Sequence, residues 1–408
     1  AQADDASNLE MFDDSAEELN VETEAEAENG FSDGEAVIAG AGDSSEVVAS
    51  GSCGSNATYK RYVDGRLVIE GSGVISSWQF RNDERIRSVE VREGITSLEY
   101  MSWAGIFEDC KNLTSVTLPK SLTSLGNYTF SGCSNLSTII LPDSLTSIGE
   151  CAFKNCDSLS SINIPKGVAM IERETFYGCS NLKDVILQDG VTTIGEGAFR
   201  SCSSISSINI PKSTTLIKER AFNNCKSLNS INIPNSVISI GERAFEDCDN
   251  LNSITLSESL TTIGRSAFVN CSSLSSIILP DSLTTLGENA FAYCGKLSNV
   301  TLSKNLKSIE ADSFYNCSSL TAIEIPEGVT SVGAGVFYNC TALGSVTFPN
   351  SLESIGNSAL YNTGIKEISL PDNLTDIGTG VFSGCSDLRS VKLPSGLKRI
   401  NNSMFSGC

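Results

Sequence analysis

The sequence predicts a repeat solenoid with a parallel β-sheet, in which about fourteen coils stack along one axis. Three observations carry this prediction: a 23-residue period, a phenylalanine fixed within that period, and prolines confined to one position of it. Each coil of such an array buries its apolar face only against its neighbours, so the period itself is the signal for the fold.

The period can be followed in three residue types. Phenylalanine recurs at intervals of 23 residues from Phe107 to Phe337, leucine takes the next position, and two more phenylalanines follow. Cysteine comes three residues behind in each of these coils except one, where Thr363 replaces it. The prolines all share a third position: Pro119, Pro142, Pro165, Pro211, Pro234, Pro280, Pro326, Pro349, Pro371 and Pro394. This agreement indicates many copies of one structural unit.

The segment 274–296 shows the predicted plan of one coil. Ile277 and Leu279 alternate with outward residues as a strand requires, and Pro280 ends the strand because it lacks a backbone N–H. The apolar residue before Gly287 predicts a short second strand, and the glycine predicts a bend. Residues 290–294 predict a short helical or 3₁₀ turn, with Phe291 as the largest side chain in the core.

Charge and apolar content divide the chain into three predicted segments. The formal charge is −21, and residues 1–50 hold fifteen acidic residues and no basic one. Because this stretch is poor in bulky apolar residues, we expect an acidic, disordered segment over 1–52. We expect a β-hairpin cap over 53–85 and the solenoid over 86–408, truncated within its last coil. The opening Ala-Gln-Ala is typical of a chain that has lost a signal peptide.

Irregularities in the pattern carry further predictions. Residues 59–70 predict a hairpin with a two-residue turn at Asp64-Gly65, which covers the open end of the stack. Four extra residues near Trp103 predict an exposed aromatic knob. The coil around Thr363 is one residue short, which predicts a tightened turn. The sequence stops inside a coil at Cys408 without a polar cap, so we expect a further domain downstream.

The units A-F-x-x-C-x-x-L-x-x-I-x-[IL]-P and [VL]-x-x-I-G closely resemble the BspA-like leucine-rich repeat family in its 23-residue form. Residues 52–56 and 67–73 are similar to a segment that precedes such repeats in secreted proteins of anaerobic bacteria. The resemblance implies a solenoid of leucine-rich-repeat type, a secreted or cell-surface location, and adhesion to host proteins or other cells. It implies no catalytic residues. Gln188, Ser257 and Ser303 depart from the pattern at the proline position.

The residues present argue against several kinds of chemistry. The chain has no histidine, which removes Ser-His-Asp, Cys-His and His-metal arrangements. It has no phosphate-binding glycine loop and no Cys-x-x-Cys pair, so we expect no cofactor and no metal. It has no basic stripe and no apolar run of about 18 residues, which argues against nucleic acid and membrane insertion. We do not expect an enzyme, and a carbohydrate-active enzyme with paired carboxylates is the less favoured alternative.

The fifteen cysteines are predicted to be mainly buried thiols. Thirteen of them lie in register, where stacked side chains point the same way, an arrangement that does not suit the dihedral angle of a disulfide. Cys53 and Cys151 lie outside the register, and we expect each to be either an exposed thiol or joined to an unidentified partner.

The candidate binding residues are tyrosines. Outward strand positions are mainly Ser, Thr and Asn without aromatic residues, which favours protein contact over sugar but leaves carbohydrate as a possible ligand. Regular Thr-x-Thr rows, as in an ice-binding array, are missing. The tyrosines lie one or two positions after the core phenylalanine or leucine: Tyr315, Tyr338, Tyr361, Tyr293 and Tyr177. They either form a partner-binding patch or only shield the turns.

We therefore predict an extracellular or cell-surface protein that binds protein ligands through its repeat surface, with adhesion as the working function. The ligand is expected on a host or on a neighbouring cell. Two alternatives come from other classes: a structural spacer that displays a missing C-terminal domain, and the carbohydrate-active enzyme.

Overall fold

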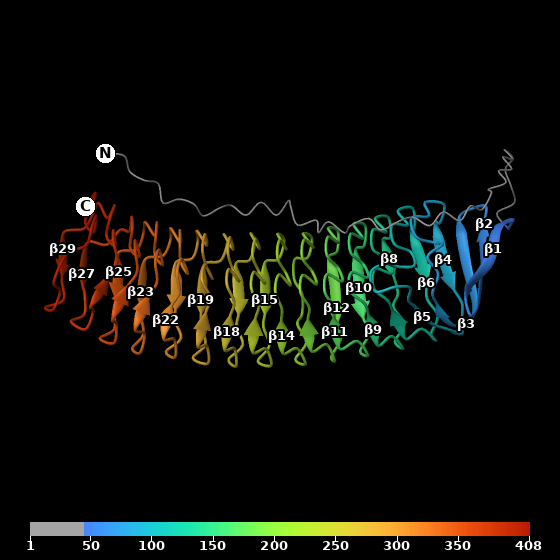
Figure 1. Cartoon of the computed structure of the whole chain (residues 1–408), viewed down its shortest axis with the longest axis horizontal. Coiled ribbons are helices and arrows are strands. Elements are labelled where there is room, and N and C mark those ends of the chain that lie inside the picture. Colours follow the sequence, from blue (N-terminus) through green and yellow to red (C-terminus); the bar gives the residue numbers. More distant parts are fainter. Residues whose placement is uncertain (1–44) are drawn as a thin grey trace, which may run out of the picture. The chain divides into compact units, whose positions relative to one another are not determined.

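A computed structural model describes residues 45–408, and these residues form one continuous row of coils (Figure 1). Most coils contribute one short strand to each of two rows of parallel strands, which we call the first and the second sheet. Each row is divided into several hydrogen-bonded segments, and paired strands are in register, as Ser276 of one coil is with Asn299 of the next. The predicted leucine-rich-repeat solenoid of about fourteen coils is confirmed.

The first sheet has one strand per coil, except in the coil that begins at Ile205, where no strand forms. Its strands end one to three residues before the proline position, and they end in the same way where Gln188, Ser257 or Ser303 replaces the proline. They are β4 (Ser88–Val91), β6 (Ser115–Thr117), β8 (Thr138–Ile139), β10 (Ser161–Ile164), β12 (Asp184–Leu187), β15 (Ser230–Asn232), β17 (Ser253–Thr255), β19 (Ser276–Ile278), β21 (Asn299–Thr301), β23 (Ala322–Glu324), β25 (Ser345–Thr347), β27 (Glu367–Ser369) and β29 (Ser390–Lys392).

The second sheet is built from shorter strands. The last residue of each strand is apolar and buried, and in most coils a glycine follows it. They are β5 (Ile95–Leu98), β7 (Ser124–Leu125), β9 (Ser147–Ile148), β11 (Met170–Ile171), β13 (Thr193–Ile194), β14 (Leu216–Ile217), β16 (Ser239–Ile240), β18 (Thr262–Ile263), β20 (Thr285–Leu286), β22 (Ser308–Ile309), β24 (Ser331–Val332), β26 (Ser354–Ile355) and β28 (Asp376–Ile377).

The N-terminal end of the array is closed by three antiparallel strands, β1 (Val47–Gly54), β2 (Asn56–Tyr62) and β3 (Arg66–Ile75). The long strand β3 also pairs in parallel with both β4 and β5, so it acts as the first coil of both sheets. Phe80, which follows it, stacks on the first predicted core phenylalanine at 5.7 Å. The repeat therefore starts within the segment that was predicted to be a separate hairpin cap.

Two predictions for this end of the chain are wrong in part. Residues 1–44 of the predicted disordered segment lie outside the described residues, but β1 begins at Val47 and orders the remainder of that segment. The β2–β3 loop has three residues, Val63 to Gly65, rather than two. Gly65 adopts a positive φ of 85°, as the last residue of a three-residue hairpin loop commonly does.

A column of stacked phenylalanines fills the core. From Phe80 to Phe337 the rings of neighbouring coils lie nearly parallel, with centroids between 5.2 Å at Phe268–Phe291 and 5.9 Å at Phe314–Phe337. All of these rings are buried. We call this column the phenylalanine ladder; Leu360 interrupts it, and it resumes at Phe382 and Phe405.

The turns around the ladder are not helical, so the prediction of helical or 3₁₀ turns is wrong: no helix is present in residues 45–408. Around the ladder phenylalanine, every second backbone N–H donates to a carbonyl of the next coil instead of to a carbonyl of its own coil. Arg220, Phe222 and Asn224 donate to the carbonyls of Glu242, Ala244 and Glu246, each at 2.8 Å. We call this set of stacked turns the turn column.

Residues with left-handed backbone make this alternation of N–H directions possible. In most coils the residues two before and two after the ladder phenylalanine have positive φ, for example 51° at Arg220 and 60° at Asn224. A helix would need φ near −63° throughout and would direct all its N–H groups along its own axis. The intervening N–H groups close tight turns within the coil, as Asn223 does on the carbonyl of Arg220 at 3.1 Å.

In most coils a glycine follows the second-sheet strand, and it allows a close approach as well as a bend. Four coils have another residue in its place: Glu99, Glu172, Lys218 and Glu310. A Cβ at Gly287 would lie 2.4 Å from the backbone nitrogen of Arg265 in the preceding coil, a distance that no side chain tolerates. This glycine lets neighbouring backbones come close enough for their hydrogen bonds, as from Gly287 N–H to the Ile263 carbonyl at 2.9 Å.

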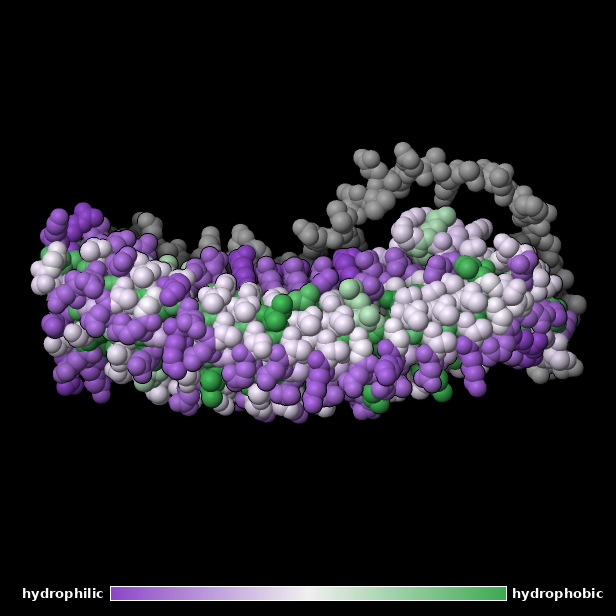
Figure 2. Space-filling view, turned by 90° about the horizontal axis from the view of Figure 1, so that it is seen from below, coloured by the Kyte–Doolittle hydropathy of each residue, from purple (hydrophilic) through white to green (hydrophobic). Residues whose placement is uncertain are grey.

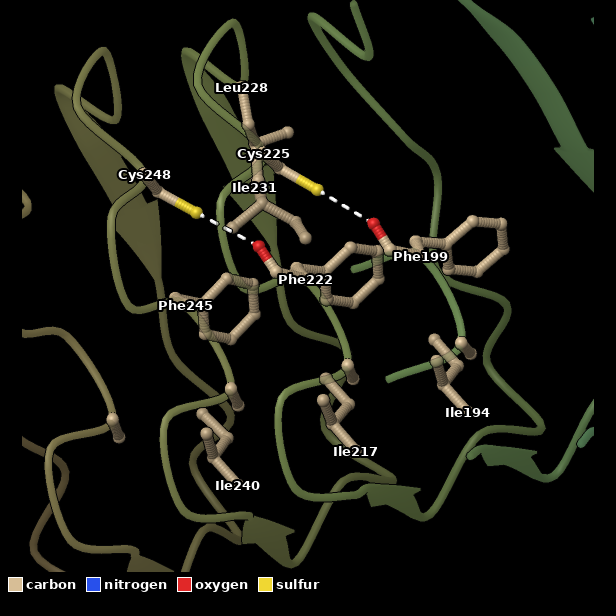
Figure 3. Packing of buried hydrophobic residues seen from close by; sticks show 14 of the residues in the cluster. Ile194, Phe199, Ile217, Phe222, Cys225, Leu228, Ile231, Ile240, Phe245 and Cys248 are labelled. Carbon is tan, nitrogen blue, oxygen red and sulfur yellow. Dashed lines mark hydrogen bonds between the residues drawn. The ribbon is translucent and has the colours of Figure 1, made fainter. Parts of the chain in front are cut away.

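The register cysteines form the predicted ladder of buried thiols, and the structure adds hydrogen bonds between coils that the sequence did not indicate. The thiol of Cys225 donates to the carbonyl of Phe199 in the preceding coil at 3.2 Å, and Cys248 does the same to Phe222 at 3.3 Å (Figure 3). Each of these carbonyls also accepts the N–H of the cysteine in its own coil, so both of its lone pairs are used. Burial raises the pKa of the Cys225 thiol to about 12.

The irregular positions of this ladder are also buried. Thr363, which replaces a cysteine in the short coil, donates its hydroxyl to the Leu360 carbonyl at 3.1 Å and lies 3.2 Å from the Cys385 sulfur. Cys53 and Cys151 are both buried and free, so the expectation of exposed or paired thiols is wrong for them. Burial raises the pKa of each to about 11.

Removing one ring from the phenylalanine ladder tests its contribution. Phe245→Ala should lower the free energy of unfolding by about 3–5 kcal/mol, because it opens a cavity within the core. Phe245→Leu is the matched control and should cost much less, since leucine occupies the same position at Leu360. Hydrogen exchange should rise mainly in the adjacent coils. A uniform rise across the whole array would contradict nearest-neighbour stacking.

The state of the cysteines can be read by thiol titration without reductant. In the native protein only Cys408, the one exposed cysteine among residues 45–408, should react quickly. After denaturation all fifteen should react, because each buried thiol is reduced in the fold. A denatured count below about five would mean that most of the ladder is disulfide-linked, against the geometry of stacked parallel side chains.

Candidate partner-binding surface

The turn column brings four of the five predicted tyrosines together. The rings of Tyr315 and Tyr338 lie 4.9 Å apart with an interplanar angle of 9°, and those of Tyr338 and Tyr361 lie 4.3 Å apart at the same angle. Tyr293 extends the row at 5.3 Å from Tyr315, tilted by 54° because it comes from the left-handed position of its turn. We call these four residues the tyrosine stack.

Stacking decides which part of each ring a partner can reach. The rings of Tyr315, Tyr338 and Tyr361 are half-buried and cover one another's faces, so a partner meets mainly the edges of these rings. Burial raises the pKa of the Tyr315 hydroxyl to about 12, and the neighbouring Tyr293 and Tyr338 add to this rise. The Tyr315 hydroxyl therefore keeps its proton at neutral pH, and it is hydrogen-bonded to Tyr293 within the stack.

Tyr177 lies in the same position of an earlier coil but apart from the tyrosine stack. The ammonium of Lys154 lies 4.9 Å from its ring centroid and the guanidinium of Arg200 lies 5.5 Å from it, one from each neighbouring coil. Cations already cover this ring, so the structure separates Tyr177 from the other predicted residues.

Between Tyr177 and the tyrosine stack, the turn column carries a lattice of charges. Its ion pairs run between neighbouring residues and neighbouring coils, with N–O distances from 2.7 Å at Arg220–Glu219 to 3.9 Å at Arg265–Glu288. Most of these side chains are partly exposed, so each pair contributes little stability. These ion pairs end where the tyrosine stack begins, although the Asp312 carboxylate still lies close enough to raise the pKa of Tyr315.

A second surface feature comes from the insertion, residues 99–104. The prediction of an exposed aromatic knob is confirmed: Trp103 is 62% exposed and Met101 is 44% exposed, while Tyr100 packs against the core. Trp78 on the preceding coil is 67% exposed, so both tryptophans of the chain face solvent at this end. In the sequence, the only signal of this feature was a coil four residues too long.

The insertion lies beside the following coils and borders an open hollow of about 480 Å³. The amide of Asn127 links the insertion to the next coil, because this side chain donates to the Ser102 carbonyl at 2.9 Å and accepts the Glu150 N–H at 2.9 Å. The carboxylates that line the hollow come from three different coils, and we call it the glutamate hollow: Glu99, Glu150 and Glu172.

Apolar side chains elsewhere on the surface are scattered, except that Ile140 lines a shallow hollow with Leu118, Leu141 and Pro142. Ile140, Ile186 and Ile278 project from the first sheet, between polar neighbours, and interrupt a face that was predicted to be polar. On the face shown in Figure 2, green apolar atoms appear as separate spots and do not merge into one large patch. A broad hydrophobic interface is therefore not present on that face.

Two further kinds of site are absent from the described residues. Residues 45–408 contain no cluster of three or more His, Cys, Asp or Glu side chains arranged to hold a metal ion. Within the same range, no helix has the length and hydrophobicity that a membrane crossing requires.

Comparison with known families decides the identity. The family model for the BspA type leucine rich repeat region matches residues 103–229, 215–321 and 307–408. The chain belongs to the BspA type leucine rich repeat family. The resemblance inferred from the repeat unit is thereby confirmed.

Solved structures agree with this assignment. A leucine-rich repeat protein from Bacteroides ovatus is 28% identical, covers 86% of this chain and 91% of its own, and superposes with a TM-score of 0.64. A leucine-rich repeat protein from Eubacterium ventriosum is 25% identical, covers 87% of this chain and 99% of its own, and gives a TM-score of 0.56. A search of the curated proteins finds no significant match.

Proposed function

We propose that this BspA type repeat protein is an extracellular or cell-surface protein that binds protein ligands, with adhesion to a host or a neighbouring cell as its role. The observation that carries the proposal is the tyrosine stack. The other coils place Glu, Ser, Lys, Arg, Asn, Val or Ala at the position after the ladder residue, so the core does not require an aromatic ring there.

The chemistry of the tyrosine stack favours a protein partner over a glycan. Glycans usually pack against an open aromatic face, and the faces inside this stack are covered by neighbouring rings at 4.3 and 4.9 Å. Ring edges together with hydroxyl donors are the groups that make tyrosine frequent at protein interfaces. The rings are held in place before binding, so little rotamer entropy is lost when a partner docks.

Removing the tyrosine stack tests the proposal. The variant Tyr315→Ser/Tyr338→Ser/Tyr361→Ser should bind a ligand found among extracellular matrix and cell-surface proteins at least about tenfold more weakly than the wild type. Its thermal stability should change little, because Ser131 and Ser383 occupy the same position in other coils. Binding is measured by calorimetry and stability by thermal unfolding.

Tyr177→Ser is the matched control, since it removes a tyrosine from the same position outside the tyrosine stack. It should leave binding unchanged. If the triple variant binds as the wild type does but melts at a lower temperature, the tyrosines only cover the turns and the proposal falls. If no protein in the panel binds the wild type, a structural spacer becomes the better account.

A further inference from the structure

A column of charges with alternating sign runs along the turns that follow the first sheet. It occupies the position directly after the proline position and takes one residue from each of six consecutive coils. In chain order its charges are negative, positive, negative, positive, negative and positive. We call these residues the alternating column: Glu93, Lys120, Asp143, Lys166, Asp189 and Lys212. At about 4.8 Å between neighbouring coils, the column is roughly 24 Å long.

The fold does not require this alternation. At the same position further along the array, Asn235 is neutral, and the acids Glu258 and Asp281 follow each other on adjacent coils. Backbone capping does not explain it either. The Glu93 carboxylate accepts the Lys120 N–H of the next coil at 3.0 Å, but a lysine side chain cannot accept such a bond. The lysines of the alternating column therefore have no role in holding the turns together.

The side chains of the alternating column are open to a partner. All six residues are exposed. Within residues 45–408, five of them form no ion pair: Lys120, Asp143, Lys166, Asp189 and Lys212. The charges are thus ordered in position along the array without being neutralised by fixed contacts.

Reading the alternating column backwards reverses every sign. Two copies that lie antiparallel, with a two-fold axis between the third and fourth residues, therefore meet with opposite charges at every position. The pairs across this contact, each formed twice, are Glu93 with Lys212, Lys120 with Asp189, and Asp143 with Lys166. The coils lie in one row without a sharp bend (Figure 1), so one column can follow another over this length.

An apolar recess lies beside the alternating column. Lys120 and Asp143 also line the shallow hollow formed by Leu118, Ile140 and neighbouring residues, which measures about 670 Å³. Ile140 is 85% exposed, the largest exposed fraction among the large apolar side chains of the described residues. Exposed ion pairs contribute little individually, whereas covering apolar surface stabilises a contact without being screened by salt. The recess therefore adds an apolar component to a contact whose register is set by charge.

We propose that the alternating column binds a second copy of this chain in antiparallel orientation, which gives a two-fold symmetric dimer. The inference does not depend on the proposed function, because it uses a different turn of the coil from the tyrosine stack. It names the partner as the protein itself, since the column is complementary to its own reversed order.

The test measures self-association of the full chain by sedimentation equilibrium. The wild type should form a dimer at an ionic strength of about 0.05 M, and the dimer should weaken as salt is added, because exposed charges are screened. Lys120→Glu/Lys166→Glu should raise the dissociation constant of the dimer by at least about tenfold, and so should Asp143→Lys/Asp189→Lys. Each variant places like charges opposite each other in four of the six pairs.

Mixing the two double variants is the decisive step. All six pairs between one copy of each are opposite in sign again, so an equimolar mixture should form a one-to-one heterodimer. The substituted side chains are exposed, so each variant should melt close to the wild type. A mixture that fails to associate would overturn the proposal, and so would a wild type that stays monomeric up to its solubility limit.

A matched control makes the same change of charge outside the alternating column. Lys296 and Lys307 are exposed and lie on later coils, so Lys296→Glu/Lys307→Glu should change the dissociation constant by less than about twofold. If this control weakened the dimer as much as Lys120→Glu/Lys166→Glu does, association would respond only to net charge and the proposed contact would be wrong.

Discussion

The structure depends on hydrogen bonds that leave each turn for the next coil. Short strands of two to four residues cannot hold the second half of a coil in place by themselves. The turn column supplies the missing bonds, as when Phe222 N–H donates to the Ala244 carbonyl at 2.8 Å. This geometry fixes the spacing at which the phenylalanine rings stack and at which each cysteine thiol reaches the preceding carbonyl.

Because the same bonds repeat in every coil, the surface is organised in columns. Positions that point inward or approach a neighbouring backbone, such as Phe291 and Gly287, are restricted by packing. Positions that point outward from the turn column are free to vary, and they hold the ion pairs, the tyrosine stack and the rim of the glutamate hollow. Binding in this family member is therefore proposed where the repeat tolerates variation, on a scaffold whose core stays constant.

Much of the fold could be predicted because the sequence repeats itself. The phenylalanine period predicted the stacked core, the prolines predicted where the first-sheet strands end, and the extra residues near Trp103 predicted an exposed knob. The tyrosine spacing of 23 residues predicted that Tyr315, Tyr338 and Tyr361 lie together, and the structure shows their rings stacked.

The prediction of helical turns was wrong, and the glutamate hollow was not predicted, because both depend on contacts between coils. Residues around Ala-Phe have helical propensity, but the turns follow the inter-coil bonds instead. The signal was present: the residue two after the ladder phenylalanine is Asn, Asp or Gly in almost every coil, the residue types that accept positive φ. The glutamate hollow could not be foreseen, because Glu99, Glu150 and Glu172 meet only through the way the insertion lies beside later coils.

The left-handed turn position is the most direct test of this account. Asn316 has φ of 58° and donates its N–H to the Tyr338 carbonyl at 2.7 Å. The free energy of unfolding of Asn316→Gly should lie within about 0.5 kcal/mol of the wild type, whereas Asn316→Val should lose about 1–2 kcal/mol, because only the β-branched residue resists positive φ. Equal stability of the two variants would contradict the claim that left-handed turns hold the coils together.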